Sequence, residues 1–415
     1  MILGLLTPIW RRNSWYAAGR YGQAMPIGAR WCVSFLGMKS PVCEMFGIEF
    51  PILAFSHCRD VVAAVSKAGG LGVLGVVAHS PAQLEIDLTW IEEEIGELPY
   101  GVDIIIPAKL ATGSASGAPT VAEIDELIPQ EHRDFVNDII DRYDVPGLAD
   151  EGKGWVSGSD SAPFSADRAA GHLDVAMSHN IALIANALGP PPGYLIEQAH
   201  AKGIKVVALA GTVTHAERHV AAGVDLIVAQ GAEAGGHTGE IGTMVLVPEI
   251  VDAVAPVPVL GAGGIGRGRQ MAAAMALGAA GVWCGSVWLT TEEAETHPTV
   301  KQKMLAARST DTLRSRSLTG KPARQLRSAW TDEWERDDTP APLGMPLQPL
   351  LIADAQRRIN RAAHTEGSGA ADLSNYFVGQ IVGTMNKTLP ARQVVYDIVE
   401  EFIEATQHLN ALLED

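Results

Sequence analysis

The feature of this sequence that most constrains its fold is a repeated alternation of short apolar runs with segments of helical pattern. Eight runs follow one another: PILAF (51–55), LGVLG (71–75), YGVDIII (100–106), IALIANALGPPP (181–192), IKVVALAG (204–211), VDLIVAQ (224–230), VPVLGAG (257–263) and GVWCG (281–285). Continuous apolar runs are typical of parallel strands that are buried on both faces. Eight such strands separated by helices favour an α/β fold, a (β/α)8 TIM barrel, over an open doubly wound sheet. The helix between the sixth and seventh runs is expected over 248–254.

The chain departs from this rhythm at its start, within the region of the barrel and after the eighth run. Residues 1–37 contain four arginines and no acid, and we expect a poorly ordered extension there; the arginines follow the apolar start, unlike the charges of a secretory signal. Residues 107–165 read as an insertion, partly helical, with Gly/Ser-rich tracts. The expected organisation is therefore a barrel over 38–300 that contains this insertion, a lid or substrate subdomain over 301–388, and a C-terminal helix over 389–415 that packs on the barrel.

Composition limits the partners that the chain can have. It has 48 acidic and 31 basic side chains among 415 residues, a formal net charge of -17, which repels nucleic-acid backbones. No run reaches the roughly 18 apolar residues of a membrane span. Four cysteines without a CxxC spacing predict neither a zinc site nor a disulfide framework. We expect a soluble cytoplasmic protein with a small-molecule substrate and no metal, nucleic-acid or membrane partner; its oligomeric state, a homodimer for example, stays open.

Two glycine-rich loops predict an anion site. GAGGIGRG (261–268) lies between the seventh run and a helix, and Gly285-Ser286 follows the eighth run. Glycine lets backbone N–H groups approach a phosphate closely, and the loops after strands 7 and 8 of a barrel commonly form one phosphate site. The first loop also matches the GxGxxG dinucleotide pattern, but its place late in the series argues against a Rossmann site.

A third loop, EAGGHTGE (233–240), contains a candidate base. Its paired glycines allow a flat ligand to lie against the backbone. Histidine is the side chain whose ordinary pKa suits it to accept a proton near neutral pH. A single loop histidine can equally be structural, and the adjacent phosphate site is what favours a catalytic role for His237.

Together these segments resemble the nitronate monooxygenase family, formerly called 2-nitropropane dioxygenases. That family also includes flavin-dependent enoyl-acyl-carrier-protein reductases and NADH:quinone reductases. The likeness covers residues 41 to about 290 and, more loosely, GKPAR (320–324) and VGQIVG (378–383). The segments that carry it are PILAF, AAVSKAGGLGVLG (63–75), GVD (101–103), AQGAEAGGHTGE (229–240), GAGGIG (261–266) and CGSVWL (284–289). The resemblance implies an FMN-binding TIM barrel.

The resemblance also implies roles for the matched residues. Ala54 and Phe55 would line the flavin, Asp103 would approach its ring, and Gln230 would contact the ribityl chain or the ring edge. Gly235 and Gly236 would lie beside Gln230, and Gly263, Gly264, Gly285 and Ser286 would hold the FMN phosphate. His237 matches the base of the nitronate enzymes, and in the reductase members the same residue lies beside the substrate.

This sequence departs from the family pattern at three places. The usual first-strand loop APMxG is replaced by Ala54-Phe55-Ser56-His57, which brings a second imidazole and then Cys58 near the flavin. Cys58 could face the substrate or simply fill apolar space. Position 103 is Asp where the family usually has Asn, and a negative charge there would disfavour an anionic reduced flavin unless it is protonated or paired. The lysine that some members carry after the fifth strand is absent from VVALAGTVTH.

These observations predict an FMN-dependent oxidoreductase, a nitronate monooxygenase that oxidises alkyl nitronates with O2 and uses His237 as its base. One alternative is an NAD(P)H-dependent FMN reductase or desaturase that acts on an enoyl thioester, an oxo compound or a quinone. The long insertion and the 301–375 region would suit such a larger substrate. An alternative of another class is a barrel that binds flavin without turnover.

Overall fold

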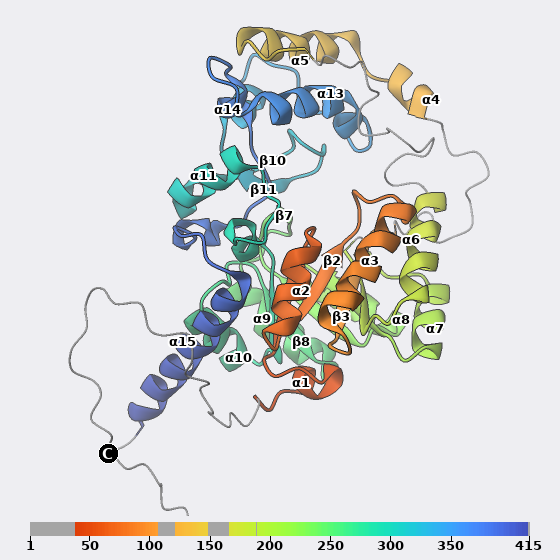
Figure 1. Ribbon diagram of the computed structural model, residues 1–415, viewed down its shortest axis with the longest axis vertical. Helices are drawn as coiled ribbons and strands as arrows, with labels where there is room; N and C mark the ends of the chain where they lie inside the picture. The colour runs from red at the N-terminus through yellow and green to blue at the C-terminus, as the bar shows by residue number, and fades with distance from the viewer. Residues whose placement is uncertain (1–37, 107–120, 148–165, 188, 414–415) are drawn as a thin grey trace, which may run out of the picture. The chain divides into compact units, whose positions relative to one another are not determined.

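The computed structural model describes residues 38–106, 121–147, 166–187 and 189–413 (Figure 1). The predicted extension over 1–37 and the Gly/Ser-rich tracts of the insertion lie outside these residues. Within them, eight parallel strands form a closed barrel whose strands follow one another in chain order. The strands are β1 (Ile52–Ser56), β2 (Leu71–Gly75), β3 (Tyr100–Ile104), β4 (Leu183–Asn186), β5 (Lys205–Ala210), β6 (Leu226–Gln230), β8 (Val259–Ala262) and β9 (Gly281–Cys284). The predicted TIM barrel is confirmed.

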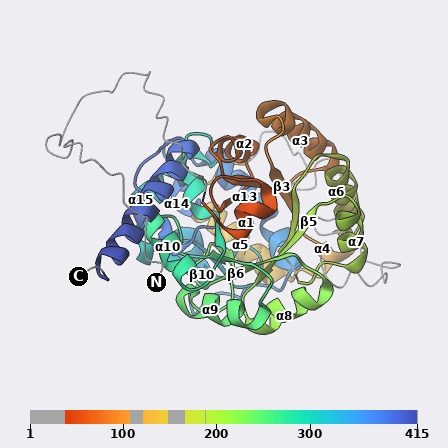
Figure 2. The same cartoon turned by 90° about the horizontal axis from the view of Figure 1, so that it is seen from below.

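Helices surround the barrel, as Figure 2 shows. They are α2 (Arg59–Lys67), α3 (Pro81–Ile95), α6 (Ala166–Ser178), α7 (Gly193–Ala201), α8 (Val213–Ala222), α9 (Thr243–Val254) and α10 (Gly268–Ala276). Their ends follow from local sequence: the hydroxyl of Ser80 accepts a hydrogen bond from the N–H of Gln83 at the start of α3, and Pro81 occupies its first turn, where a missing N–H is harmless. None of the helices in the described part of the chain has the length and apolar character of a membrane span.

The strand residues separate two apolar layers because successive side chains of a strand point to opposite faces. One set, which includes Leu53, Val73, Leu183, Val228 and Leu260, fills the barrel interior together with residues of α1 (Pro41–Phe46). The alternate set packs outward against the helices. Burial on both faces is the physical reason why the strands read as unbroken apolar runs.

A second, smaller sheet is formed by segments that are distant in the sequence. It contains β7 (Gly236–His237), β10 (Thr312–Ser315) and β11 (Ala323–Leu326), in the order β10-β11-β7. The pairs are antiparallel, and His237 lies opposite Ala323. The loop after β6 is thereby joined to the GKPAR segment.

The helices that follow the barrel share a core with the insertion. α5 (Gln130–Arg142) packs with α12 (Ala329–Trp334), α13 (Leu347–Ala362) and α14 (Ala370–Leu373), and α4 (Val121–Glu126) contacts α13 (Figure 1). Trp330 and Trp334 are buried at the centre of this core. Two stretches that look unrelated in the sequence thus form one helical cluster, which we call the cap.

The remaining elements connect the barrel to its last helix. α11 (Pro298–Ala306), η1 (Ser286–Thr290), η2 (Ser309–Asp311) and η3 (Gln380–Thr384) pack around Val300, Met304, Val378 and Val382. α15 (Ala391–Ala411) then lies along α10 and α2. Gly268 is in close contact with α15, since a Cβ atom there would come within 2.1 Å of the carbonyl oxygen of Ile398.

Candidate functional site

The predicted flavin-lining residues lie at the carboxyl ends of the barrel strands, where active sites of TIM barrels are found. Asp103 and Gln230 point into the barrel, because their neighbours Val102 and Ala229 belong to the outer apolar layer. Phe55 also packs against the inner layer. Ala54 is fully buried in the outer layer, so its backbone rather than its side chain could line a ligand.

The aromatic side chains at the end of β1 and in β9 contact one another. The ring of Phe55 stacks on Trp283 with centroids 6.1 Å apart and meets the edge of His57 at 5.1 Å. A Cβ atom on Gly75 would come within 2.8 Å of both Phe55 and His57, so only glycine leaves room for these two rings. The sequence alone gave no sign of this role for Gly75.

His57 is a neutral imidazole with one nitrogen engaged. Its Nδ1 lies 2.7 Å from the carbonyl oxygen of Gly75, and since a carbonyl can only accept, Nδ1 must carry the proton. Burial lowers the pKa of His57, and the nearby His79 lowers it further. The second imidazole noticed in the sequence therefore has its basic lone pair on Nε2.

Asp103 is a buried acid whose Oδ1 atom is unpaired within the part of the chain that the structure describes. Its side chain is 5% exposed, and its Oδ1 has no hydrogen-bond partner among the described residues. Burial raises the pKa of Asp103 to about 7. A carboxyl group near a flavin should be protonated or paired. With a pKa of about 7, Asp103 is mostly protonated below neutral pH.

The loops after β6 and β8 are pressed together. Gly263 has a φ of 95° and Gly264 a φ of 68°, and a Cβ atom on Gly263 would lie 2.9 Å from the carbonyl oxygen of Gly231. Both the backbone angle and the close approach require glycine. The cradle that results is lined by backbone, as a phosphate site without basic side chains needs.

The N-terminus of α9 is already occupied by the protein itself. The Glu233 carboxylate accepts the backbone N–H of Thr243 at 2.9 Å and lies 2.8 Å from its hydroxyl. This contact explains why α9 begins at Thr243, before the predicted 248–254: a distant carboxylate stabilises the extra turn. The N-terminal N–H groups of α9 are therefore not available to an anion, and the predicted anion site rests on the loops after β8 and β9.

Gly285 and Ser286 adjoin the same cluster of loops. The hydroxyl of Ser286 accepts the backbone N–H of Gly379 at 2.8 Å. A Cβ atom on Gly379 would lie 2.6 Å from the carbonyl oxygen of Glu233 and 3.0 Å from the nitrogen of Gly235. The VGQIVG segment, loosely matched in the sequence, therefore packs against the glycine loops.

His237 lies outside the barrel, on β7 of the small sheet. Its Nε2 is 2.8 Å from the hydroxyl of Thr319, which in turn lies 3.1 Å from the carbonyl oxygen of Lys321. A hydroxyl has one proton. If the Thr319 hydroxyl donates that proton to the Lys321 carbonyl oxygen, it accepts a hydrogen bond from the Nε2–H of His237. The unprotonated, basic nitrogen of His237 is then Nδ1.

The surroundings keep His237 neutral. The residue is exposed to solvent, yet packing around its ring lowers its pKa, and the positive charge of Lys321 lowers it further. A neutral imidazole is the form that accepts a proton. Thr319 and Lys321, which orient His237 and lower its pKa, were not linked to it in the sequence because they are 82 and 84 positions away. The one signal was the loose GKPAR match, which contains Lys321 and directly follows Thr319.

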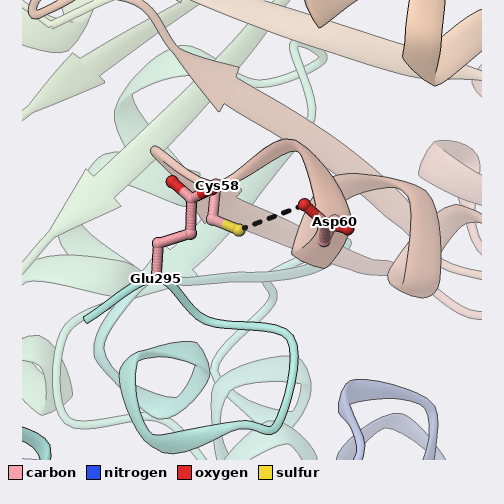
Figure 3. A group of neighbouring side chains, drawn as sticks. All are labelled: Cys58, Asp60 and Glu295. Atoms are coloured by element: carbon pink, nitrogen blue, oxygen red, sulfur yellow. Dashed lines mark hydrogen bonds between the residues drawn. The ribbon is translucent and has the colours of Figure 1, made fainter. Parts of the chain in front are cut away.

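Cys58 belongs to a separate group with Asp60 and Glu295, drawn in Figure 3. The thiol is buried and donates to the carbonyl oxygen of Glu293 at 3.0 Å, and it lies 3.9 Å from the Asp60 carboxylate. Burial raises the pKa of Cys58, which keeps it a thiol and a poor metal ligand. Of the two interpretations, the structure favours the packing role.

β5 has a lysine, but not at the end of the strand where some family members carry one. The lysine of β5 is Lys205, the first residue of the strand, and its ammonium lies 3.4 Å from Asp225. It is therefore at the opposite end of the barrel from Asp103 and Gln230, because the parallel strands all run the same way.

Comparisons with known proteins agree with the fold and identify the family. The family model described as nitronate monooxygenase matches residues 39–401. A Mycobacterium tuberculosis protein, Rv1533, whose name suggests a monooxygenase, is 60% identical over 377 residues, covering 91% of this chain and 100% of that protein. A Staphylococcus saprophyticus protein whose name suggests a nitronate monooxygenase is 30% identical over 329 residues, covering 76% of this chain and 85% of its own.

Solved structures show the same fold. FabK from Thermotoga maritima has a TM-score of 0.66 at 26% identity, covering 90% of this chain and 99% of its own. A nitroalkane oxidase from Streptomyces ansochromogenes has a TM-score of 0.71 at 24% identity, covering 89% and 99%, a likeness that concerns the fold alone. The resemblance seen in the sequence is confirmed: this chain belongs to the nitronate monooxygenase family and is a flavin-dependent oxidoreductase.

Proposed function

We propose that this protein is an FMN-dependent nitronate monooxygenase that oxidises alkyl nitronates with O2. The observation that carries the proposal is the position of His237. It follows Gly235 and Gly236, next to the loop cluster at the barrel end. Thr319 orients its imidazole, while burial and the charge of Lys321 lower its pKa. A base beside a flat, backbone-lined site is the arrangement that abstraction of a proton α to a nitro group needs.

The residues at the barrel end fit a flavin mononucleotide. The backbone cradle of Gly263 and Gly264, with Gly285 and Ser286 beside it, would bind one phosphate group. Phe55, Asp103 and Gln230, which face the barrel end, would contact the ring system or the ribityl chain, with the backbone of Ala54, Gly235 and Gly236 nearby. A bound flavin would supply the electron transfer between the nitronate and O2.

His237 and Lys321 would divide the acid–base work. The lowered pKa of His237 leaves its imidazole able to take the α proton of a neutral nitroalkane near neutral pH. The ammonium of Lys321, close enough to depress that pKa, would favour the negative charge that appears on the nitro oxygens. A preformed nitronate has already lost this proton and would bypass the base.

A second candidate is an NAD(P)H-dependent reductase or desaturase for an enoyl thioester, an oxo compound or a quinone. Two observations favour it: the likeness to FabK and the cap, whose own apolar core is built partly from the insertion. Such a unit offers more surface for a large substrate than a nitroalkane requires. A flavin-binding barrel without turnover is disfavoured by the neutral His237 and by membership of an enzyme family.

The two candidates are separated by their redox partners. With FMN bound, oxygen uptake would be measured with propionate 3-nitronate and with its neutral nitroalkane, and flavin bleaching by NADH and NADPH would be followed without oxygen. Rapid oxygen uptake with the nitronate and slow bleaching by either nucleotide are expected. Fast bleaching without nitronate turnover would instead establish the reductase, and neither activity would favour the barrel without turnover.

A further inference from the structure

The acid Asp103 is a feature that the proposed reaction does not use. It is the one acidic residue in the eight strands of the barrel. Asp103 comes near the end of β3, where its partners in the neighbouring strands are Gly75 and Ala185. Neither partner has a polar side chain. The carboxyl group therefore enters the barrel end between two residues that offer it no hydrogen bond.

The ionisable groups around β3 are engaged elsewhere. His57 bonds to the carbonyl oxygen of Gly75, and His79 after β2 pairs with Asp87 of α3 at 3.1 Å. On α2, Arg59 pairs with Asp87 and Lys67 pairs with Glu94. On α6, both Arg168 and His172 bond to the carbonyl oxygen of His79. Glu92 of α3 is bonded to Tyr100 and His179, and Lys205 of β5 to Asp225.

Within the described residues, no charged side chain shifts the pKa of Asp103; burial is the cause of its shift to about 7. A carboxylate buried without a partner is costly, and the neutral acid is much less so. The neutral acid also differs in kind, because it is a hydrogen-bond donor where the carboxylate only accepts. Because Oδ1 has no hydrogen-bond partner among the described residues, it is available to bond to a ligand.

We propose that Asp103 binds the flavin as a neutral carboxylic acid, donating a hydrogen bond to an acceptor atom of the ring, so that flavin affinity depends on the protonation of this one residue. The inference rests on the proposed function for the identity of the ligand as FMN. The proton stays on Asp103 and no covalent bond changes. Asn, the residue usual at this position in the family, could donate a similar bond at any pH.

The test is the affinity of the apoprotein for FMN between pH 6 and pH 9, from the quenching of flavin fluorescence. For the wild type, the Kd should increase about tenfold for each pH unit above the pKa of free Asp103, the slope for one linked proton. Asp103→Asn should bind with an affinity that lacks this increase. The FMN phosphate itself loses a proton near pH 6, so the difference between the two proteins is the readout.

A control and a second measurement guard the conclusion. Asp252→Asn, which removes an exposed acid from α9, should keep the wild-type slope. If Asp103→Asn does not fold, calorimetric titration of the wild type in two buffers of different ionisation enthalpy should show uptake of about one proton on FMN binding at pH 8. A wild-type Kd without the increase, no proton uptake, or the same slope in Asp103→Asn would overturn the inference while leaving FMN as the ligand. Failure of every variant to bind FMN at any pH would overturn the proposed cofactor itself.

Discussion

The barrel and the small sheet contribute to the site in different ways. Asp103 and Gln230 lie on strands that are hydrogen-bonded on both sides and buried on both faces. His237 lies on a two-residue strand, is exposed, and is held by its pairing with β11 and its bond to Thr319. The difference suggests a division of labour in which the rigid barrel would keep a cofactor and the open sheet would meet a substrate that enters and leaves.

The largest expected effect tests the role of the small sheet. His237→Asn removes the basic nitrogen, so oxidation of a neutral nitroalkane should fall by roughly 10²–10⁴-fold, the usual contribution of a general base. Oxidation of the preformed nitronate should change little. Steady-state oxygen uptake with each substrate gives the ratio.

The matched control is His200→Asn. His200 bonds to Asp225 beside the start of β5, at the end of the barrel opposite to the proposed site, so this variant should oxidise both substrates like the wild type. An equal loss of both activities in His237→Asn would mean that the sheet binds substrate without acting as a base. FMN affinity should stay unchanged, because the imidazole of His237 is not among the groups assigned to the flavin.

The second effect tests the barrel through its buried acid. The pKa of Asp103 is about 7 in the folded protein against an ordinary value of 3.8, so between these values the unfolded chain releases the proton first. The contribution of Asp103 to the free energy of unfolding is thus fully present below about pH 4 and lost as pH rises to about 7. Asp103→Asn apoprotein should be more stable than the wild type by a few kcal/mol at pH 8 and about equal at pH 4. Urea unfolding at the two pH values measures this, and equal differences at both would refute the assignment of a raised pKa.

The third effect tests the phosphate cradle. Gly263→Ala places a methyl group against the carbonyl oxygen of Gly231, and FMN affinity should fall ten- to a hundredfold as the loops are pushed apart. Gly203→Ala is the control, because Gly203 has a similar φ of 75° with nothing within 4 Å. Both variants bear the left-handed strain of about 1–2 kcal/mol, so only their difference in FMN titration reports on the cradle. Equal affinities would place the phosphate elsewhere.

The smallest effect concerns the cap. The Arg142 guanidinium donates two hydrogen bonds of 2.8 Å to the Glu333 carboxylate, joining α5 to α12. Because the Arg142 side chain is 38% exposed, Arg142→Ala should cost only about 1 kcal/mol. Amide exchange in α5 and α12 should quicken while FMN affinity stays constant. Arg327→Ala, which removes an exposed pair with Asp332, should leave exchange in α5 unchanged; a loss of FMN affinity in Arg142→Ala would show that the cap and the barrel end are coupled.

The barrel could be predicted almost strand for strand, because burial on both faces leaves a continuous apolar run for each strand. The glycine loops were visible for a similar reason. Gly263 has a backbone conformation and a close contact that disfavour any other residue. The glycine itself therefore marks the loop in the sequence. The start of α9 was misplaced because its stabilising carboxylate, Glu233, comes from another loop.

By itself, then, the sequence determined the (β/α)8 fold and the glycine loops, because these depend on local periodicity and on the conformational freedom of single residues. Three features came from the tertiary structure instead: His237 lies beside Thr319 and Lys321, the insertion packs with α12–α14, and Oδ1 of Asp103 has no partner among the described residues. Each of these depends on which side chains the closed barrel and the small sheet bring together, and no single stretch of sequence records such a meeting.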